Sequence, residues 1–170
     1  MISLTYTRTM QAYNRWMNER LYDCCSRLSD EERKRDAGAF FKSIHGTLNH
    51  LLLADRIWLG RFTGKPFVVK SLDQELYSDF TQLRSERKAT DAAIADWSSA
   101  LAEADLAAEL SYMSVDNPKP RRSPLWLAVT HFFNHQTHHR GQLTTLLAQR
   151  IIDPGVTDLI WLPELQRGSE

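Results

Sequence analysis

The sequence predicts an all-α protein: a four-helix bundle with a long crossover between the third and fourth helices and a short C-terminal helix. Three observations indicate this class. Four long segments repeat apolar residues at helical spacing, and helix-capping and helix-ending residues separate them. Only one short stretch alternates apolar and polar residues as a strand does. With 170 residues, we expect a single domain over residues 1–170.

The first helix is expected over residues 5–28. Its apolar positions are Met10, Tyr13, Met17, Leu21, Cys24 and Leu28. The sequence Ser-Asp-Glu-Glu at 29–32 matches the Ser-x-x-Glu capping box and predicts a short turn of helix. Residues 33–39 are charged and contain a glycine, so we interpret them as a connector. A second helix is expected over residues 40–61, because Gly64 and Pro66 follow it as helix-ending residues.

The third helix is expected to begin at Ser71-Leu72-Asp73 and to reach about Ala104. Its middle, residues 84–91, is strongly polar and is expected to bend or to project into solvent. Residues 110–115 alternate apolar and polar side chains, and the sequence Asp-Asn-Pro-Lys-Pro at 116–120 then turns the chain. This stretch predicts an irregular or weakly extended crossover.

The fourth helix is expected to start near Ser123-Pro124, because proline is accepted in the first turn, and to continue to about Arg150. Asp-Pro-Gly at 153–155 ends it, and residues 156–162 are expected to form the short terminal helix.

Composition narrows the partners and the compartment. Lys plus Arg and Asp plus Glu number 21 each, which disfavours nucleic acid or a charged membrane surface as the main partner. No apolar run reaches the roughly 18 residues needed to cross a bilayer, and the N-terminus does not resemble an export signal. The two cysteines, Cys24 and Cys25, are adjacent, so they provide no disulfide framework. We therefore predict a cytoplasmic protein.

Histidines occur in only two short segments of the sequence. They are His45 and His50 in the second predicted helix, and His131, His135, His138 and His139 in the fourth. Imidazole is the commonest neutral nitrogen ligand for zinc, nickel, copper and iron. Because helical bundles commonly hold metals between facing helices, this distribution predicts a metal site between these two helices.

Spacing ranks the histidines of the fourth helix. His131, His135 and His139 follow i, i+4, i+8 spacing and share one face, while His138 competes through an i, i+3 pair with His135. A helical wheel places His139 roughly 70° and His135 roughly 110° from the apolar direction, and the other two point further outward. Geometry therefore favours His135 and His139 as the ligand pair.

Spacing does not settle the second helix. His45 and His50 lie roughly 140° apart around the helix axis, so they cannot both face one ion. Small side chains on the His50 face leave room for an ion and favour it modestly; they belong to Ser43, Gly46, Thr47 and Ala54. Three imidazoles would leave coordination positions open, which is typical of chemistry rather than of a closed structural zinc site. Taken singly, His45, His131 and His138 are interpreted as structural or surface histidines.

Several stretches carry a family resemblance: NRWMNERLY at 14–22, SIHGTLNHLLLADRIWLGRF at 43–62, FNHQTHHRGQL at 133–143 and GVTDLIWLPE at 155–164. They resemble the DinB-like family of DNA-damage-inducible proteins over almost the whole chain. The resemblance implies a DinB-type bundle in an up-down-down-up arrangement, often as a homodimer. It also implies a divalent metal (nickel, zinc or iron) held by His50, His135 and His139, and the choice of His50 over His45 rests on it.

For function, the resemblance implies thiol chemistry, because related proteins include transferases and isomerases that use small thiol cofactors. We expect a metal-dependent enzyme of thiol-transferase or hydrolase type that acts on a small molecule through a metal-activated thiol or water. The alternative is a non-catalytic metal-binding stress-response module, and a third possibility is an inert helical dimer. A deep pocket that opens onto the metal would favour the enzyme.

Four further polar residues are candidates for roles beside the metal. Asn134 or Gln142 could orient an imidazole or a bound water, and Asp55 could orient a histidine or pair with an arginine. Arg140 could bind a substrate carboxylate or phosphate, or pair with an acidic side chain.

Overall fold

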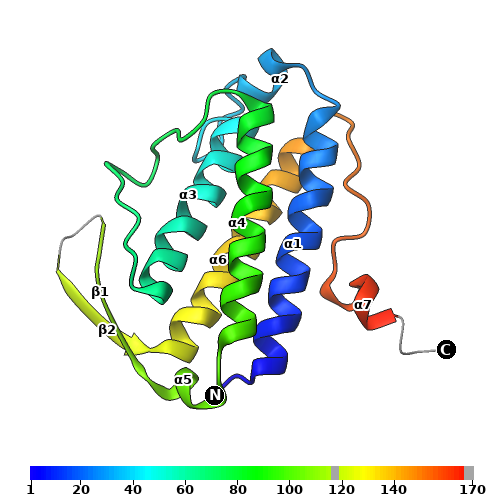
Figure 1. Ribbon diagram of the computed structural model, residues 1–170. Helices are drawn as coiled ribbons and strands as arrows, with labels where there is room; N and C mark the ends of the chain where they lie inside the picture. The colour runs from blue at the N-terminus through cyan, green and yellow to red at the C-terminus, as the bar shows by residue number, and fades with distance from the viewer. Residues whose placement is uncertain (116–118, 167–170) are drawn as a thin grey trace.

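The computed structural model describes residues 1–115 and 119–166, and four long helices form its body (Figure 1). They are α1 (Leu4–Ser26), α3 (Ile44–Thr63), α4 (Phe80–Ala100) and α6 (Leu125–Ala148). Helix α1 packs against α4 and α6, and α3 packs against the same two helices. The apolar core therefore lies along the middle of the bundle, and the predicted all-α class is confirmed.

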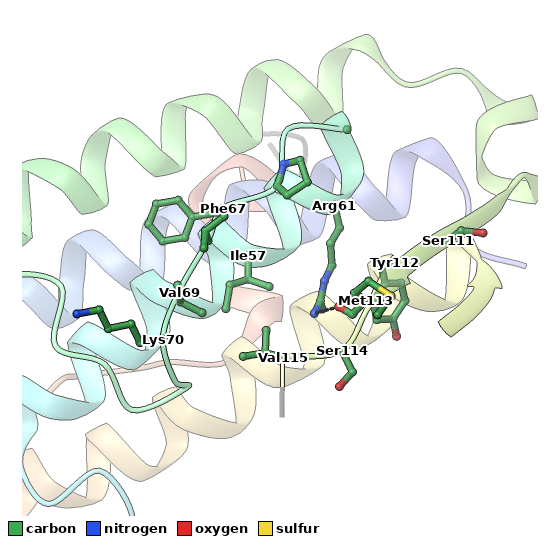
Figure 2. A pocket seen from close by; sticks show the side chains of 14 residues that line it. Ile57, Arg61, Phe67, Val69, Lys70, Ser111, Tyr112, Met113, Ser114 and Val115 are labelled. Atoms are coloured by element: carbon green, nitrogen blue, oxygen red, sulfur yellow. Dashed lines mark hydrogen bonds between the residues drawn. The ribbon is translucent and has the colours of Figure 1, made fainter. Parts of the chain in front are cut away.

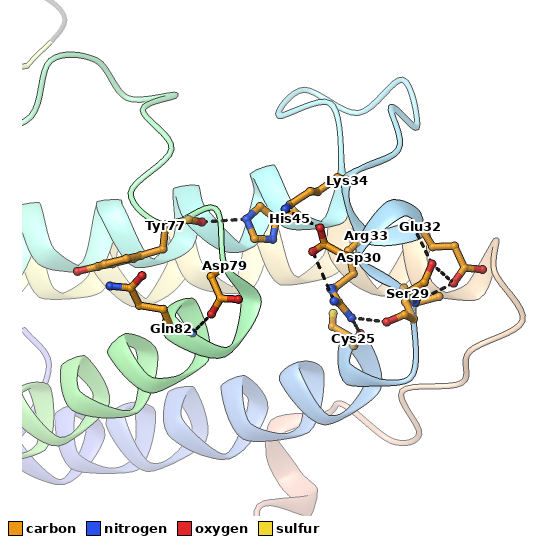
Figure 3. Close-up of polar contacts among 11 residues, drawn as sticks. Cys25, Ser29, Asp30, Glu32, Arg33, Lys34, His45, Tyr77, Asp79 and Gln82 are labelled. Atoms are coloured by element: carbon orange, nitrogen blue, oxygen red, sulfur yellow. Dashed lines mark hydrogen bonds and ion pairs between the residues drawn. The ribbon is translucent and has the colours of Figure 1, made fainter.

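Local sequence signals fix where the helices begin and end. The side chains of Ser3, Ser43 and Asp79 cap α1, α3 and α4 by accepting hydrogen bonds from backbone N–H groups three residues ahead. The predicted capping box at residues 29–32 opens the short helix α2 (Asp30–Lys34), and Figure 3 shows its reciprocal contacts between Ser29 and Glu32. The second predicted helix begins at residue 44 instead of residue 40, because residues 39–42 form a tight turn.

The start of the third helix is a correction. Helix α4 begins at Phe80 rather than at residue 71, and residues 71–79 form a loop against α3. Side chains of α3 bind the backbone of this loop: the Asn49 Oδ1 atom accepts from Leu76 and Tyr77 N–H, while His45 Nε2 lies 2.9 Å from Tyr77 O (Figure 3). These contacts satisfy backbone N–H and C=O groups of the loop that would otherwise bond within a helix.

The end of α4 and the crossover also differ from the predictions. Helix α4 ends at Ala100, and the short α5 (Glu103–Ala107) follows. The crossover forms an antiparallel hairpin of β1 (Glu109–Met113) and β2 (Pro120–Pro124) rather than a weakly extended segment. The predicted turn at 116–120 falls largely on 116–118, outside the described residues. The hairpin lies beside α3 and α6, at the end of the bundle where the chain begins (Figure 1).

The C-terminal segment is mostly extended. In place of a helix over residues 156–162, it forms a single 3-10 turn (Leu159–Trp161) and the short α7 (Pro163–Gln166). Tyr13 Oη donates to the carbonyl oxygen of Thr157 at 2.6 Å, and Arg20 Nε donates to that of Pro154, so side chains of α1 hold this segment in place. Cys24 and Cys25 are free and buried. None of the helices in the described ranges combines the length and apolar character needed to cross a membrane.

Gly60 allows the chain that leaves α3 to turn back closely over the helix. A Cβ atom at this position would lie 2.7 Å from Lys65 O and 2.8 Å from Phe67 N. We expect Gly60→Ala to lower the free energy of unfolding by about 1–3 kcal/mol, because the backbone must shift. At the matched position Gly141, inside α6, an added Cβ meets nothing within 4 Å, so alanine there should be neutral or stabilising by up to about 1 kcal/mol. Equal urea denaturation midpoints for the two variants would contradict this contact.

Candidate metal centre

Three histidines from two helices converge at one point between α3 and α6. His50 comes from α3, and His135 and His139 come from successive turns of α6; their ligand atoms all lie within 4.8 Å of one another. The Nε2 atom of His135 lies 3.3 Å from that of His50 and 3.2 Å from that of His139. Two nitrogens bound to one tetrahedral zinc ion at about 2.05 Å are about 3.3 Å apart, so these two separations match those expected around a single ion.

The outer ring nitrogens determine which way two of the lone pairs point. His50 Nδ1 lies 2.9 Å from the carbonyl oxygen of Leu72, and His139 Nδ1 lies 2.8 Å from Gln142 Oε1. Because both oxygens are acceptors, each Nδ1 carries the ring proton and each Nε2 presents a lone pair to the centre. Among the described residues, the buried His135 Nδ1 has no hydrogen-bond partner. Two inward lone pairs beside a third imidazole form a binding site for a cation.

Burial keeps these imidazoles neutral. Burial, with a smaller contribution from the neighbouring imidazoles, lowers the pKa of His50 to about 4 and that of His135 to about 3. The pKa of His139 is also lowered, mainly by burial. Near pH 7 all three rings are therefore uncharged, which is the form that coordinates a metal ion.

The turn before α3 adds an aromatic wall to the site. The ring of Phe41 stacks on the imidazole of His50 with centroids 3.8 Å apart, and its edge faces His139 at 5.4 Å. The turn that places Phe41 is closed by a bridge between Ala39 and Lys42, with Lys42 in the left-handed region at φ 64°. Phe41 was expected to lie in the second helix, so its stacking on His50 was not predicted.

Two pockets border the three histidines. The larger, of about 650 Å³, touches all three imidazoles and is lined by Phe40 and Phe41 on one side. The smaller, of about 320 Å³, touches His50 and His135 and lies toward the β-hairpin. The side chain or backbone of Leu72 borders both pockets. The site is therefore accessible from two directions.

The remaining histidines lie outside the cluster. His45 is buried and its Nε2 contacts the loop backbone at Tyr77. The ring of His131 packs against Trp58 in a tilted arrangement with centroids 5.1 Å apart, and His138 Nε2 lies 3.3 Å from Gln142 Nε2. Each of the three has a contact that accounts for it without a metal ion.

Of the four further polar candidates, Gln142 is the one whose side chain bonds a histidine of the cluster. Asn134 and Arg140 line a different pocket, between α1, α6 and the C-terminal segment, and the buried Arg140 bonds Asn14. Asp55 is fully buried and pairs with Arg87 at 2.7 Å. The structure therefore places these three away from the histidine cluster. The role of the Leu72 carbonyl as the acceptor for His50 was not predicted, because Leu72 was expected to lie in a helix.

Gln142 offers a test of how the outer contacts support the centre. We expect Gln142→Leu to weaken metal binding by about 10–100-fold, because His139 loses the acceptor that fixes its tautomer. The measurement is a competition titration against a chromophoric chelator. Gln82→Leu, on an exposed position of the first turn of α4, is the control and should bind metal as the unmodified protein does. An unchanged affinity for Gln142→Leu would remove Gln142 from the site.

The fold and the site together define a class: a four-helix bundle in which two helices bring three neutral imidazoles to one point that could hold a metal ion. The chain belongs to the DinB family, whose family model matches residues 1–169. It is also similar to Protein DinB of Bacillus subtilis (strain 168), at 24% identity over 140 residues, which cover 81% of each chain. The family resemblance inferred from the sequence motifs is confirmed.

Proposed function

We propose that this DinB-family protein is a metal-dependent enzyme of thiol-transferase or hydrolase type, with its ion held by His50, His135 and His139. The observation that carries the proposal is that two separate pockets, of about 650 and 320 Å³, open onto the same cluster of imidazoles. A site that only sequesters an ion needs no such space, whereas an enzyme needs room for its substrate beside the ion.

The donor set supports an open, reactive site. Three neutral imidazoles suit nickel, zinc or iron and leave at least one coordination position for another ligand. A bound divalent ion supplies either a water whose pKa is lowered to about 7 or a site that holds a thiolate nucleophile. The protein's own part is to fix the ligands, through Leu72 and Gln142, and to exclude water from one side of His50 by the stacked ring of Phe41.

The alternative is a non-catalytic metal-binding stress-response module with the same three ligands. It is favoured by the exposure of one wall of the larger pocket, where Phe40 is strongly exposed. The expected homodimer stays a prediction in either case. Metal content does not separate the two functions, so the test must measure reaction.

The test begins with the metal content of natively purified protein, which we expect to be about one divalent ion per chain. Cobalt-substituted protein is then given a small thiol with 1-chloro-2,4-dinitrobenzene, or 4-nitrophenyl acetate alone, to probe transfer and hydrolysis. The enzyme predicts metal-dependent turnover of one of these substrates and its loss in His135→Ala. Stoichiometric metal with no acceleration of either reaction would favour the module.

A further inference from the structure

The smaller pocket beside the cluster has a charge character of its own. It lies between α3, α6 and the hairpin, and its polar lining includes His50, His131 and His135 from the helices together with Arg61, Tyr112 and Arg121. Trp58 adds an aromatic wall. No acidic side chain lines it within residues 1–115 and 119–166. A molecule in this pocket could therefore contact both the histidine cluster and two guanidinium groups.

Arg61 is held in place without a carboxylate. Its guanidinium carbon lies 4.4 Å from the ring centroids of both Trp58 and Tyr112, and one Nη donates to the carbonyl oxygen of Met113 at 3.1 Å. Figure 2 shows this reach from α3 to β1, seen from a neighbouring pocket of about 390 Å³ that shares Arg61 and Tyr112. No described acidic group lies within ion-pair distance of Arg61. The burial that lowers its pKa leaves it charged at neutral pH.

Arg121 reaches the same pocket from the second strand. It stands directly opposite Tyr112 in the hairpin register, so both side chains project from one face of the sheet. The next residue, Arg122, projects from the other face and pairs with Glu109 at 3.7 Å. Arg121 has no such carboxylate among the described residues. Of these two neighbouring arginines, Arg121 therefore lines the pocket, whereas Arg122 pairs with an acidic side chain on the other face.

Cation–π stacking explains how Arg61 fastens the hairpin to α3, but it does not explain why a second guanidinium borders the same pocket. Two cations that have no counter-ion among the described residues, in the same pocket as two histidines of the cluster, match a molecule with one anionic end. The pocket's volume of about 320 Å³ suits a small organic compound rather than a polymer.

We propose that this pocket selects substrates by their carboxylate: Arg61 and Arg121 bind the carboxylate of a small organic acid whose other end reaches the ion at His50 and His135. The proposal rests on the proposed function, because it names the substrate class of the same site. It assigns the smaller pocket to the acidic substrate and leaves the larger pocket, with Phe40 and Phe41, for a second reactant or for product exit.

The test compares thiols of equal length with and without a carboxylate on cobalt-substituted protein. The probes are 3-mercaptopropionate, 4-mercaptobutyrate and 6-mercaptohexanoate, each against the corresponding mercaptoalcohol, with the sulfur-to-cobalt absorption band as readout. At least one acid should bind about tenfold or more tightly than its alcohol, because charge-assisted hydrogen bonds discriminate at that level. Equal affinities for all three pairs would overturn the proposal.

Variants locate the preference. Arg121→Met, at an exposed position, should reduce the acid-to-alcohol ratio about tenfold, and Arg61→Met should reduce it at least as much, whereas Arg122→Met should leave it unchanged. Because Arg61 also supports the hairpin, a thermal unfolding curve must show that Arg61→Met is folded, and its acid-to-alcohol ratio is interpreted together with that of Arg121→Met. A ratio that survives both Arg61→Met and Arg121→Met, or falls equally in Arg122→Met, overturns the assignment.

Failure of the proposed function gives a different result. If the protein takes up no cobalt, or no thiol of either series produces the band, the metal enzyme is wrong. The pocket is then tested on the metal-free protein by titrating hexanoate against hexanol and following the Arg61 Nε–H signal by NMR, assigned with Arg61→Met. A saturable shift with hexanoate alone supports the carboxylate site, and no shift with either compound overturns it.

Discussion

Replacing His135 with alanine is expected to leave natively purified protein without its metal ion. His135 is the central member of the cluster, since its Nε2 atom lies 3.3 Å from His50 Nε2 and 3.2 Å from His139 Nε2. Its removal leaves two ligands on different helices. Loss of an outer-shell partner typically costs about 10–100-fold in affinity, and loss of a direct ligand should cost more. The measurement is metal per chain by elemental analysis, together with a competition titration of the metal-free protein.

His131→Ala is the matched control for this experiment. His131 lies one helical turn before His135 on α6; its ring packs against Trp58 and lies beside that of His135, but it is not one of the three converging histidines. Its removal should leave metal content unchanged. If His135→Ala kept as much metal as His131→Ala, the ion would be bound elsewhere, and the three-histidine site would be abandoned.

Arg87→Met is expected to lower the free energy of unfolding by about 3–5 kcal/mol at pH 7. Arg87 is buried in the bundle core, where it pairs with Asp55 at 2.7 Å and with Asp91 at 2.8 Å. Without the guanidinium, both carboxylates remain buried, and no other residue that the structure describes forms an ion pair with them. Asn18 Nδ2 still donates to Asp91 at 2.9 Å, and Gln136 still donates to Asp55, but these neutral groups do not balance the charge. Urea denaturation measures the loss.

Arg84→Met is the control on the same helix. Arg84 lies near the surface and pairs with the exposed Asp23, so its loss should change stability by less than about 1 kcal/mol. A similar effect of the two variants would show that the buried pairs do not contribute more than an exposed one.

The destabilisation by Arg87→Met should depend on pH. Burial raises the pKa of Asp55 to about 6 even beside Arg87, and it also raises that of Asp91. Without Arg87 both values should rise further. A carboxyl whose pKa is higher in the folded than in the unfolded state, where it is about 4, is protonated in both states at low pH and then costs no stability. As pH rises above about 4, the unfolded state ionises more readily, and the folded state becomes relatively less stable. The difference from the unmodified protein should therefore be largest near pH 7 and shrink toward pH 4.

Helical periodicity and spacing predicted most of the bundle. The fourth helix, expected from near Ser123-Pro124 to Arg150, forms from Leu125 to Ala148, and the i, i+4 pair His135 and His139 shares one face as expected. These features depend on residues close in sequence, so a single chain reveals them. The assignment of His50 rested on family resemblance, because the wheel of a helix surrounded by apolar residues has no clear direction.

Tertiary contacts decided the features that the sequence did not predict. Ser71-Leu72-Asp73 has the local pattern of a helix start, yet Asn49 and His45 bind the backbone that follows and hold it as a loop until Asp79. The same difference concealed the hydrogen bond from His50 to Leu72. Asp55 lies only five residues after His50 but points to Arg87 in the core, which no spacing rule indicates.

The acceptor for His50 is a main-chain oxygen, whereas that for His139 is a side chain. A main-chain oxygen is retained when residue 72 changes identity, so the protonation pattern of His50 does not depend on which amino acid stands there. Residue 72 also lines both pockets. A substitution at residue 72 can therefore change the shape of both pockets while His50 keeps its tautomer. Substrate selectivity can thus evolve at this position without loss of metal binding.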